Sequence, residues 1–308
     1  MGAVTLLGPQ RHPAVAPELE RLGLEGPVAV VTAGWQERED EIDEMREHLD
    51  REVRNLRLYA RADEVAAEDR ELFRGHRARQ DRLRALQTLY RYRLDFALEP
   101  ARELLSQRGP TDLAKAARRS AIEALRELDR QHVVQIQEIH QEFHDRYEPF
   151  HRPVVERHCQ EIRELLEGCC ALLIAGGHVA VLLNRMRHFG LSRWIGDLPV
   201  VAWSAGAMAV SNQVVLFHDH PPQGMGNPEV LDVGLGLVDG IVVLPHADKR
   251  LRLNDPKRVE ILARRFAPAA CVPFDRGAPA LTWDGKAWHH LPGTRQLTVT
   301  GHVRVEAA

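Results

Sequence analysis

Hydrophobic and polar residues alternate with different periods in different parts of the chain. Three short segments near the N-terminus are apolar or alternating and end at glycine or a polar residue, which is typical of β-strands. They are residues 4–8 (VTLLG), 27–34 (PVAVVTAG) and 56–59 (LRLY). The charged segment 35–55 between the last two has helical spacing. This strand–helix–strand order predicts the beginning of a parallel sheet.

The pattern becomes helical between residues 63 and 167, a stretch rich in Arg, Glu, Leu, Ala and Gln. Apolar residues recur there at spacings of three and four, for example Leu83, Leu86, Leu89, Tyr90, Leu94 and Leu98. Residues 109–112 (GPTD) interrupt the pattern and offer a helix N-cap, and Pro149 and Pro153 mark a second break. We expect three or four long helices with solvated charges. Coiled-coil pairing, within the chain or between subunits, is compatible with this spacing.

The strand pattern returns after residue 168. Apolar runs closed by Gly, Pro or Asp occupy residues 169–177, 198–206, 239–247 and 269–275, with helical segments at 183–191 and 256–266. The C-terminal segments 280–291 and 295–308 alternate with a period of two, and Asp284-Gly285 is a hairpin-turn dipeptide. The whole pattern predicts an α/β sandwich that is interrupted by a helical insertion and ends in a β-meander at a sheet edge.

Composition and charge narrow the class of protein. The chain has 308 residues, of which 44% are apolar, enough for a sizeable core. Its net charge of −3 implies no general attraction to nucleic acid. The four cysteines show no CxxC spacing that would indicate a zinc site. Because no basic start precedes an apolar run and no apolar run reaches membrane-spanning length, we expect a cytoplasmic protein without a membrane partner.

The ends of three predicted strands carry the candidate chemistry. Ser204 follows the apolar run 200–203 and precedes Ala205-Gly206-Ala207, the small neighbours that a nucleophile at a tight strand-to-helix turn needs. Gly176-Gly177 ends a second strand with unobstructed backbone N–H groups, and His246 follows a third. Ordinary turns and a surface histidine are the alternative interpretations. The coincidence of three strand ends favours a site, because functional groups collect there in open α/β sheets.

A serine nucleophile needs a base, and an imidazole base needs an acid that holds its tautomer. Asp219 is the preferred acid, and Glu229, Asp232 and Asp275 are alternatives. Asp219 also belongs to a His-Asp-His cluster at residues 218–220, which raises a metal site. An H-x-H pair on a strand points both rings to one face and the aspartate to the other. We therefore expect no metal and no cofactor.

Three segments resemble the dipeptidase E and cyanophycinase family of serine peptidases. They are IAGG (174–177), WSAGA (203–207) and GLGLVDGIVVLPHADKRLRL (234–253). The family has the class I glutamine amidotransferase-like fold. The resemblance therefore implies a three-layer α/β sandwich with a mostly parallel, flavodoxin-like sheet, formed by residues 1–62 and 168–308. Residues 63–167, the helical insertion, are not part of the common family core.

The resemblance also implies roles for individual residues. Ser204 matches the nucleophile, His246 the base, and Asp219, at a spacing of 219 − 204 = 15 residues, the triad aspartate of the dipeptidase E branch. Gly177 and Ala205 match the donors of the oxyanion hole. The substrate-binding positions are Gly176, Arg250 and Arg252.

Two functions remain in competition at this point. The first is a serine peptidase or amidase that cleaves an amide bond of a small acidic peptide through a Ser-His-Asp triad and an acyl-enzyme. The second is a catalytically inactive amidotransferase-like scaffold whose helical insertion mediates oligomerisation or partner binding, since a fold alone does not establish activity.

Overall fold

A computed structural model of the chain describes residues 2–10, 14–107, 111–217 and 226–307. Its central sheet has seven strands in the order β11-β10-β1-β5-β4-β2-β3. Neighbours from β1 to β3 are parallel, whereas β10 and β11 add antiparallel strands beyond β1. The strands are β1 (Val4–Leu7), β2 (Val28–Val31), β3 (Val53–Asn55), β4 (Ala171–Ile174), β5 (Val200–Trp203), β10 (Leu281–Trp283) and β11 (Trp288–His290).

The order β3-β2-β4-β5 is the flavodoxin-like order, with β1 beyond β5. Strands β1, β2, β4 and β5 are buried along their whole length, as apolar runs in a parallel sheet require, because helices cover both faces. The predicted fold class, a three-layer sandwich with a mostly parallel sheet, is confirmed.

Different helices cover the two faces of the sheet. Leu19 of α1 (Val15–Arg21) and Met45 of α2 (Asp43–Leu49) pack with Val30 and Leu173 on one face. The other face packs against helices whose apolar positions recur every three or four residues. These helices are α3 (Leu58–Glu68), α6 (Pro153–Leu166) and α7 (Val179–His188).

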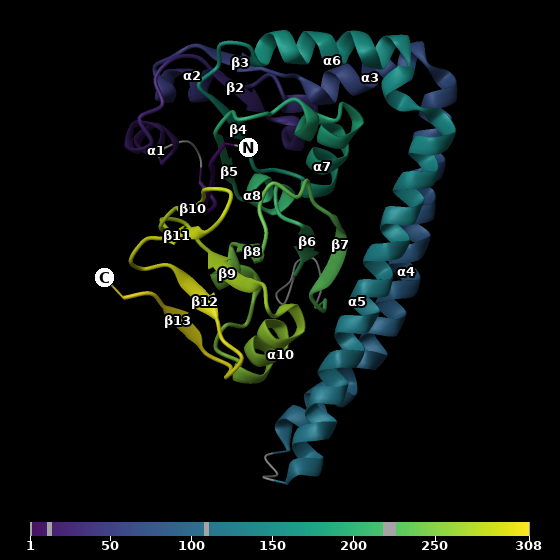
Figure 1. Cartoon of the computed structure of the whole chain (residues 1–308), viewed down its shortest axis with the longest axis vertical. Helices are drawn as coiled ribbons and strands as arrows, with labels where there is room; N and C mark the ends of the chain where they lie inside the picture. The colour runs from purple at the N-terminus through teal and green to yellow at the C-terminus, as the bar shows by residue number, and fades with distance from the viewer. Residues whose placement is uncertain (1, 11–13, 108–110, 218–225, 308) are drawn as a thin grey trace.

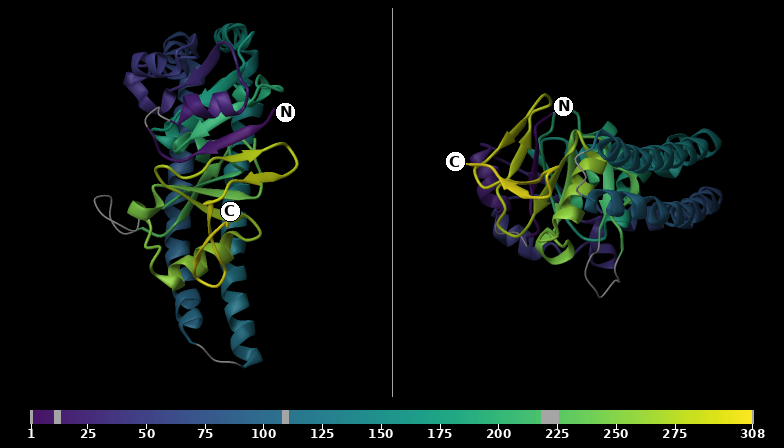
Figure 2. Two further views of the ribbon diagram at one scale, coloured as in Figure 1. Left: turned by 90° about the vertical axis from the view of Figure 1, so that its left-hand side faces the viewer. Right: turned by 90° about the horizontal axis from the view of Figure 1, so that it is seen from below.

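The insertion forms a long antiparallel helical hairpin, α4 (Arg70–Ser106) and α5 (Asp112–Tyr147), which runs along one side of the α/β unit (Figure 1). Each helix is about 55 Å long at 1.5 Å per residue. Figure 2 shows the two helices side by side, extending past the body at one end. Side chains cap both N-termini, Asp69 accepting from Leu72 N–H and Thr111 from Ala114 N–H.

The strand predicted at 56–59 is wrong. The strand occupies Val53–Asn55, and α3 begins at Leu58. Leu56 and Leu58 are both buried, so the sequence shows the alternation of apolar and polar residues that is typical of a strand. Arg57 between them has φ 50° and turns the chain. The helical region therefore begins at 58 rather than 63, and its described residues form four α-helices, α3 to α6. None of the helices in the four described ranges is both long and apolar enough to cross a membrane.

The remaining strands form three two-stranded sheets. The strands β8 (Ile241–Pro245) and β9 (Ala270–Phe274) were predicted, as were the C-terminal strands, but the pairing of β8 with β9 in a separate parallel sheet was not. The antiparallel pair β6 (Gln213–Leu216) and β7 (Glu229–Val233) was not. The other elements are β12 (Arg295–Leu297), β13 (Val303–Val305), α8 (Ala205–Ala209), α9 (Ala247–Arg250), α10 (Pro256–Phe266) and the short 3-10 helices η1 (Ala33–Arg38), η2 (Pro149–His151) and η3 (Leu191–Arg193).

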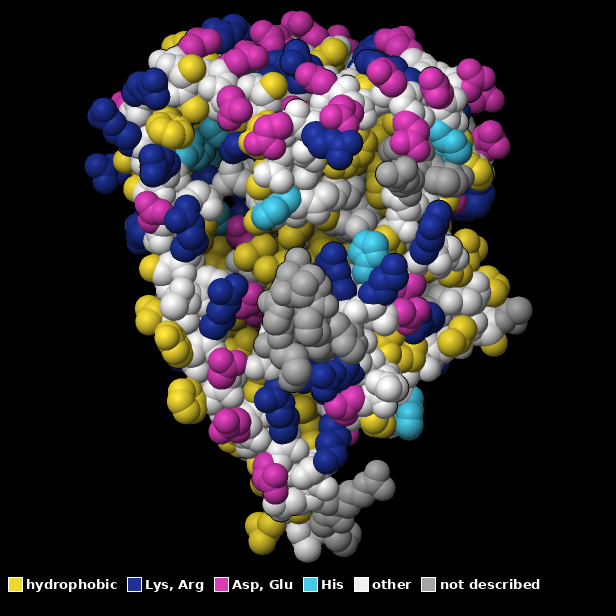
Figure 3. All heavy atoms as spheres, turned by 180° about the vertical axis from the view of Figure 1, so that it is seen from behind, with side chains coloured by type: hydrophobic (Ala, Val, Ile, Leu, Met, Phe, Trp, Pro, Cys, Tyr) yellow, Lys and Arg dark blue, Asp and Glu magenta, His cyan; other side chains and the backbone are white. Residues whose placement is uncertain are grey.

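Charged side chains are unevenly distributed over the surface, although the net charge is small. Seen from behind, acidic side chains are most frequent at the end of the molecule that carries α3 and α6, and basic side chains gather near the middle of this face (Figure 3).

Candidate active site

Ser204 has a backbone conformation that residues other than glycine rarely adopt. It follows the last residue of β5 and precedes α8, with φ 52° and ψ −117°. Residues in such sparsely populated regions persist only where the surroundings enforce them, and they cluster at functional sites. The surroundings here are tight: a Cβ on Gly206 would lie 2.2 Å from the Ile174 carbonyl oxygen, and one on Gly176 would lie 3.0 Å from the Ser204 Cβ. The small neighbours of Ser204 are therefore a packing requirement.

The glycine pair after β4 lies against the end of β2. Gly177 has φ 121°, and a Cβ there would lie 2.4 Å from the carbonyl oxygen of Gly34. His178 N–H donates to the same oxygen at 2.8 Å. The loop stands at the point where the strand order reverses between β2 and β4, the usual binding crevice of open α/β sheets. Within the described ranges, the backbone N–H groups of Gly177 and Ala205 donate no hydrogen bond, so both are free to bind an anion.

His246 follows β8 in a left-handed conformation, with φ 58° and ψ 33°. Its backbone N–H donates to the carbonyl of Phe274 at 2.8 Å, which ties the turn to the end of β9. In the described part of the chain, the Ser204 hydroxyl and the His246 ring make no side-chain hydrogen bond. The groups are thus placed at one site without a fixed contact between them.

Two adjoining cavities share three residues, Ser204, Gly177 and His246. The larger has a volume of about 850 Å³ and is also lined by both polar and aromatic side chains, among them Trp35, Arg38, Trp203, Lys249, Asp275 and Arg276. The smaller has a volume of about 270 Å³. It is also lined by the apolar residues Val179, Ala205, Met208, Leu216, Phe217 and Pro245 and by one cation, Arg250. The three predicted strand ends therefore meet at one place.

The electrostatics keep the imidazole neutral. Burial lowers the pKa of His246, and the nearby cations Arg250 and Lys249 lower it further. A neutral imidazole can accept a proton from a hydroxyl. Burial also lowers the pKa of the Arg250 guanidinium, which makes no ion pair with any described residue. The smaller cavity therefore contains a half-buried cation beside Ser204, and no described residue supplies its counter-charge.

Of the three alternative acids, only Asp275 lines a cavity with Ser204 and His246. Its carboxylate accepts from Asp248 N–H and from Arg295, both at 3.1 Å, and burial raises its pKa. Glu229 accepts from Arg91 and Gln87 on α4. Asp232 pairs with Arg187 at 2.6 Å and with His140 at 3.0 Å. These two carboxylates belong to the contact between β7 and its neighbouring helices.

Two predicted features lie elsewhere. Asp219, the preferred acid, and the rest of the 218–220 cluster fall outside the described residues. Arg252 lines a separate cavity with Arg102, Arg258 and Leu262, away from Ser204. Among the residues the structure does describe, no group of three or more His, Cys, Asp and Glu side chains could hold a metal ion.

Residue-based reasoning missed the contribution of the end of β2. Gly34 packs against the glycine loop, and Trp35 after it lines the larger cavity. The signal was present, because the run 27–34 also ends at a glycine after an apolar strand. That strand end could have been grouped with the other three.

Comparison with known proteins gives little further information. No family model matches the chain, and no curated protein matches it. A crystal structure of a peptidase from an acI-B1 Actinobacterium is similar, with a TM-score of 0.47 and 14% sequence identity, covering 100% of this chain and 95% of that chain.

Proposed function

We propose that the protein is a serine hydrolase that cleaves amide bonds, with Ser204 as the nucleophile. The observation that carries this proposal is the placement of Ser204 at a strained turn, in cavities it shares with His246 and the glycine loop. A serine on such a turn has its hydroxyl exposed at the carboxyl end of the sheet, where a substrate can approach.

Each residue then has a chemical role. His246 takes the proton of the Ser204 hydroxyl as the oxygen attacks the substrate carbonyl. The free N–H groups of Gly177 and Ala205 donate to the oxyanion of the tetrahedral intermediate, an interaction worth about 10²–10³ in rate for one donor. His246 next protonates the leaving amine, and water hydrolyses the acyl-enzyme.

We keep Asp219 as the acid that orients His246. The resemblance to the dipeptidase E branch supports it by spacing, and the other three carboxylates are already engaged by neighbouring donors. Asp275 is the competitor, because it lines the cavity. Asp219→Asn should lower kcat by orders of magnitude, whereas Asp275→Asn should act mainly on stability. A larger loss of kcat in Asp275→Asn would transfer the role to Asp275.

The smaller cavity indicates the substrate class. Arg250 has no counter-charge among the described residues, and a guanidinium binds a carboxylate through paired hydrogen bonds. A small peptide with a carboxylate near the cleaved bond is therefore the substrate class that we propose. Arg252 is not used in the proposal, since it lines another cavity.

Labelling with a fluorophosphonate tests the proposal directly. We expect modification of the wild-type protein at Ser204, loss of labelling in Ser204→Ala and in His246→Ala, and full labelling in Ser192→Ala. Ser192 is the matched control because it is an exposed serine outside these cavities. Circular dichroism should show folded protein in all variants. Equal hydrolysis of acidic peptides by wild type and Ser204→Ala would refute the proposal.

A further inference from the structure

Helix α4 exposes a row of large apolar side chains. Leu89, Tyr92 and Phe96 are 63%, 66% and 74% exposed. Their spacings of three and four place them on one face of the helix. The opposite face is buried through Tyr90, Leu94 and other residues that pack against α5 and the α/β unit. Single exposed apolar residues are common on soluble proteins, but a row on one helix face marks an interaction surface.

Small and charged residues extend this row at both ends. Ala85 and Pro100 are exposed beside the three large side chains, and Arg82 and Glu103 follow them outward. We call these seven residues the α4 stripe. From Arg82 to Phe96 the spacing is three, four, three and four, which is that of a coiled-coil seam. The stripe is about 30 Å long.

The α4 stripe is complementary to itself when two copies run in opposite directions. With the centre between Tyr92 and Arg93, Leu89 faces the partner's Phe96, Ala85 faces the partner's Pro100, and Arg82 faces the partner's Glu103. Tyr92 then lies next to the centre of the contact, facing the partner's Arg93, whose guanidinium donates to Gln131 of α5 in its own copy. A parallel arrangement would instead place Arg82 against the partner's Arg82 and Glu103 against the partner's Glu103.

We propose that the α4 stripe joins two copies of this chain in an antiparallel dimer. Apolar burial at the centre supplies the affinity, and the charges at the ends select the orientation. A stripe of seven residues on one helix is smaller than one side of an interface of standard size, so the dimer should dissociate on dilution. This proposal is independent of the proposed hydrolase activity.

Sedimentation velocity over a range of concentrations tests the surface. We expect the wild-type chain to change from monomer to dimer as its concentration rises, and Phe96→Glu to raise the dissociation constant by about tenfold or more, since each 1.4 kcal/mol corresponds to a factor of ten. Val134→Glu is the control, because Val134 is an exposed apolar residue on α5 outside the stripe. Circular dichroism and thermal unfolding should show that both variants fold.

Charge reversal tests the orientation. Arg82→Glu and Glu103→Arg should each weaken the dimer, and the double variant should restore it. Arg82 also pairs with Glu142 of α5 on the surface, but Glu103→Arg cannot repair that contact, so restoration reports on the contact between copies. A wild-type chain that stays monomeric at every concentration, or a dimer that Phe96→Glu leaves unchanged, would overturn the proposal. A double variant as weak as the single ones would overturn the antiparallel orientation.

Discussion

Three residues with strained backbone conformations lie at or beside the cavities that contain Ser204. Ser204 and His246 have positive φ and line both cavities, and Gln36, with φ 60°, lies between two residues of the larger cavity wall, Trp35 and the nearby Arg38. Each such conformation costs of order 1–3 kcal/mol. The surrounding loops therefore hold these residues in place at the expense of stability, as a site that must fix its reacting groups would require.

The lowered pKa of His246 leads to a pH prediction at this scale. A general base must be deprotonated, so the acid limb of kcat/KM should lie below pH 6.5, the ordinary value for histidine. Lys249 contributes to the lowering as a nearby positive charge. In Lys249→Gln the protonated imidazole becomes less unfavourable, its pKa rises, and the acid limb should move to higher pH. Hydrolysis rates between pH 4 and 8 provide the measurement.

Lys257→Gln serves as the control for this shift, because Lys257 is exposed at the start of α10 and does not line the cavities. It should leave the profile where the wild type has it. A movement of the limb to lower pH in Lys249→Gln would contradict the role of His246 as the base.

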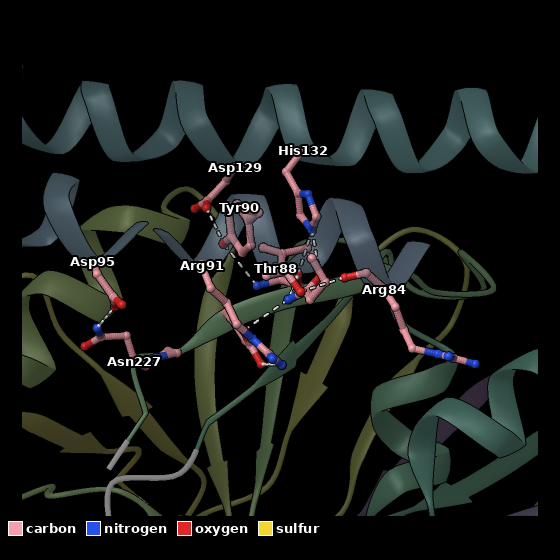
Figure 4. A network of polar contacts seen from close by, with 12 residues as sticks. Arg84, Thr88, Tyr90, Arg91, Asp95, Asp129, His132 and Asn227 are labelled. Atoms are coloured by element: carbon pink, nitrogen blue, oxygen red, sulfur yellow. Dashed lines mark hydrogen bonds and ion pairs between the residues drawn. The ribbon is translucent and has the colours of Figure 1, made fainter. Parts of the chain in front are cut away.

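At the scale of elements, a buried polar network fastens the helical hairpin to the α/β unit. Arg265 of α10 donates to both carboxylate oxygens of Asp129 on α5, at 2.6 and 2.7 Å, and to the hydroxyl of Tyr90 on α4 at 2.7 Å. Tyr90 in turn donates to Asp129 and accepts from Val230 N–H on β7. Figure 4 shows these side chains of α4 and α5 directed toward β7, together with Arg91 and His132.

Replacing Arg265 should show how much this network contributes to the free energy of unfolding. Arg265→Leu leaves the buried Asp129 carboxylate without its cationic partner, and we expect a loss of about 3–5 kcal/mol in the free energy of unfolding. Urea denaturation measures it. Arg264→Leu should cost at most about 1 kcal/mol, because Arg264 is only partly buried and pairs with Glu260 one turn away. The network would be unimportant if Arg265→Leu cost no more than this control.

Contacts between β7 and the neighbouring helices limit which elements the sequence could predict. The helices α3 to α6 and the buried strands follow from local periodicity and capping. Strands β6 and β7 do not, because Glu229 and Asp232 of β7 pair with groups on α4, α5 and α7 and disturb the alternation of polar and apolar residues. Their partners are distant in the sequence, so local patterns contain no sign of them.

The candidate site was predictable to a similar extent. Ser204, His246 and the glycine pair were found because each follows an apolar strand, and the parallel topology brings such strand ends together. The location of Arg252 in a different cavity from Arg250 could not be predicted, because it depends on how the chain turns after α9.

For the molecule as a whole, buried histidines between the hairpin α4–α5 and α7 make the free energy of unfolding depend on pH. His188 of α7 stacks on His76 of α4, with ring centroids 4.3 Å apart, and His76 lies 4.5 Å from Phe143 of α5. Burial lowers the pKa of His188 to about 3, with nearby Arg185 and Arg79 lowering it further, and burial also lowers the pKa of His76 strongly. Both rings are therefore neutral in the folded protein at neutral pH.

This neutrality makes acid destabilising. In the unfolded chain His188 has a pKa of about 6.5, so between pH 6.5 and 3 the unfolded state binds a proton that the folded state does not. The free energy of unfolding should fall by about 1.4 kcal/mol per pH unit for this residue over that window. In His188→Leu that contribution disappears, and the decline between pH 6.5 and 4.5 should be shallower by about 2 kcal/mol in total. Urea denaturation across this range gives the slope for each variant. His290→Leu is the control, because His290 is exposed on β11, and it should keep the wild-type slope. If His188→Leu also kept the wild-type slope, the buried His188 ring would take up its proton without unfolding.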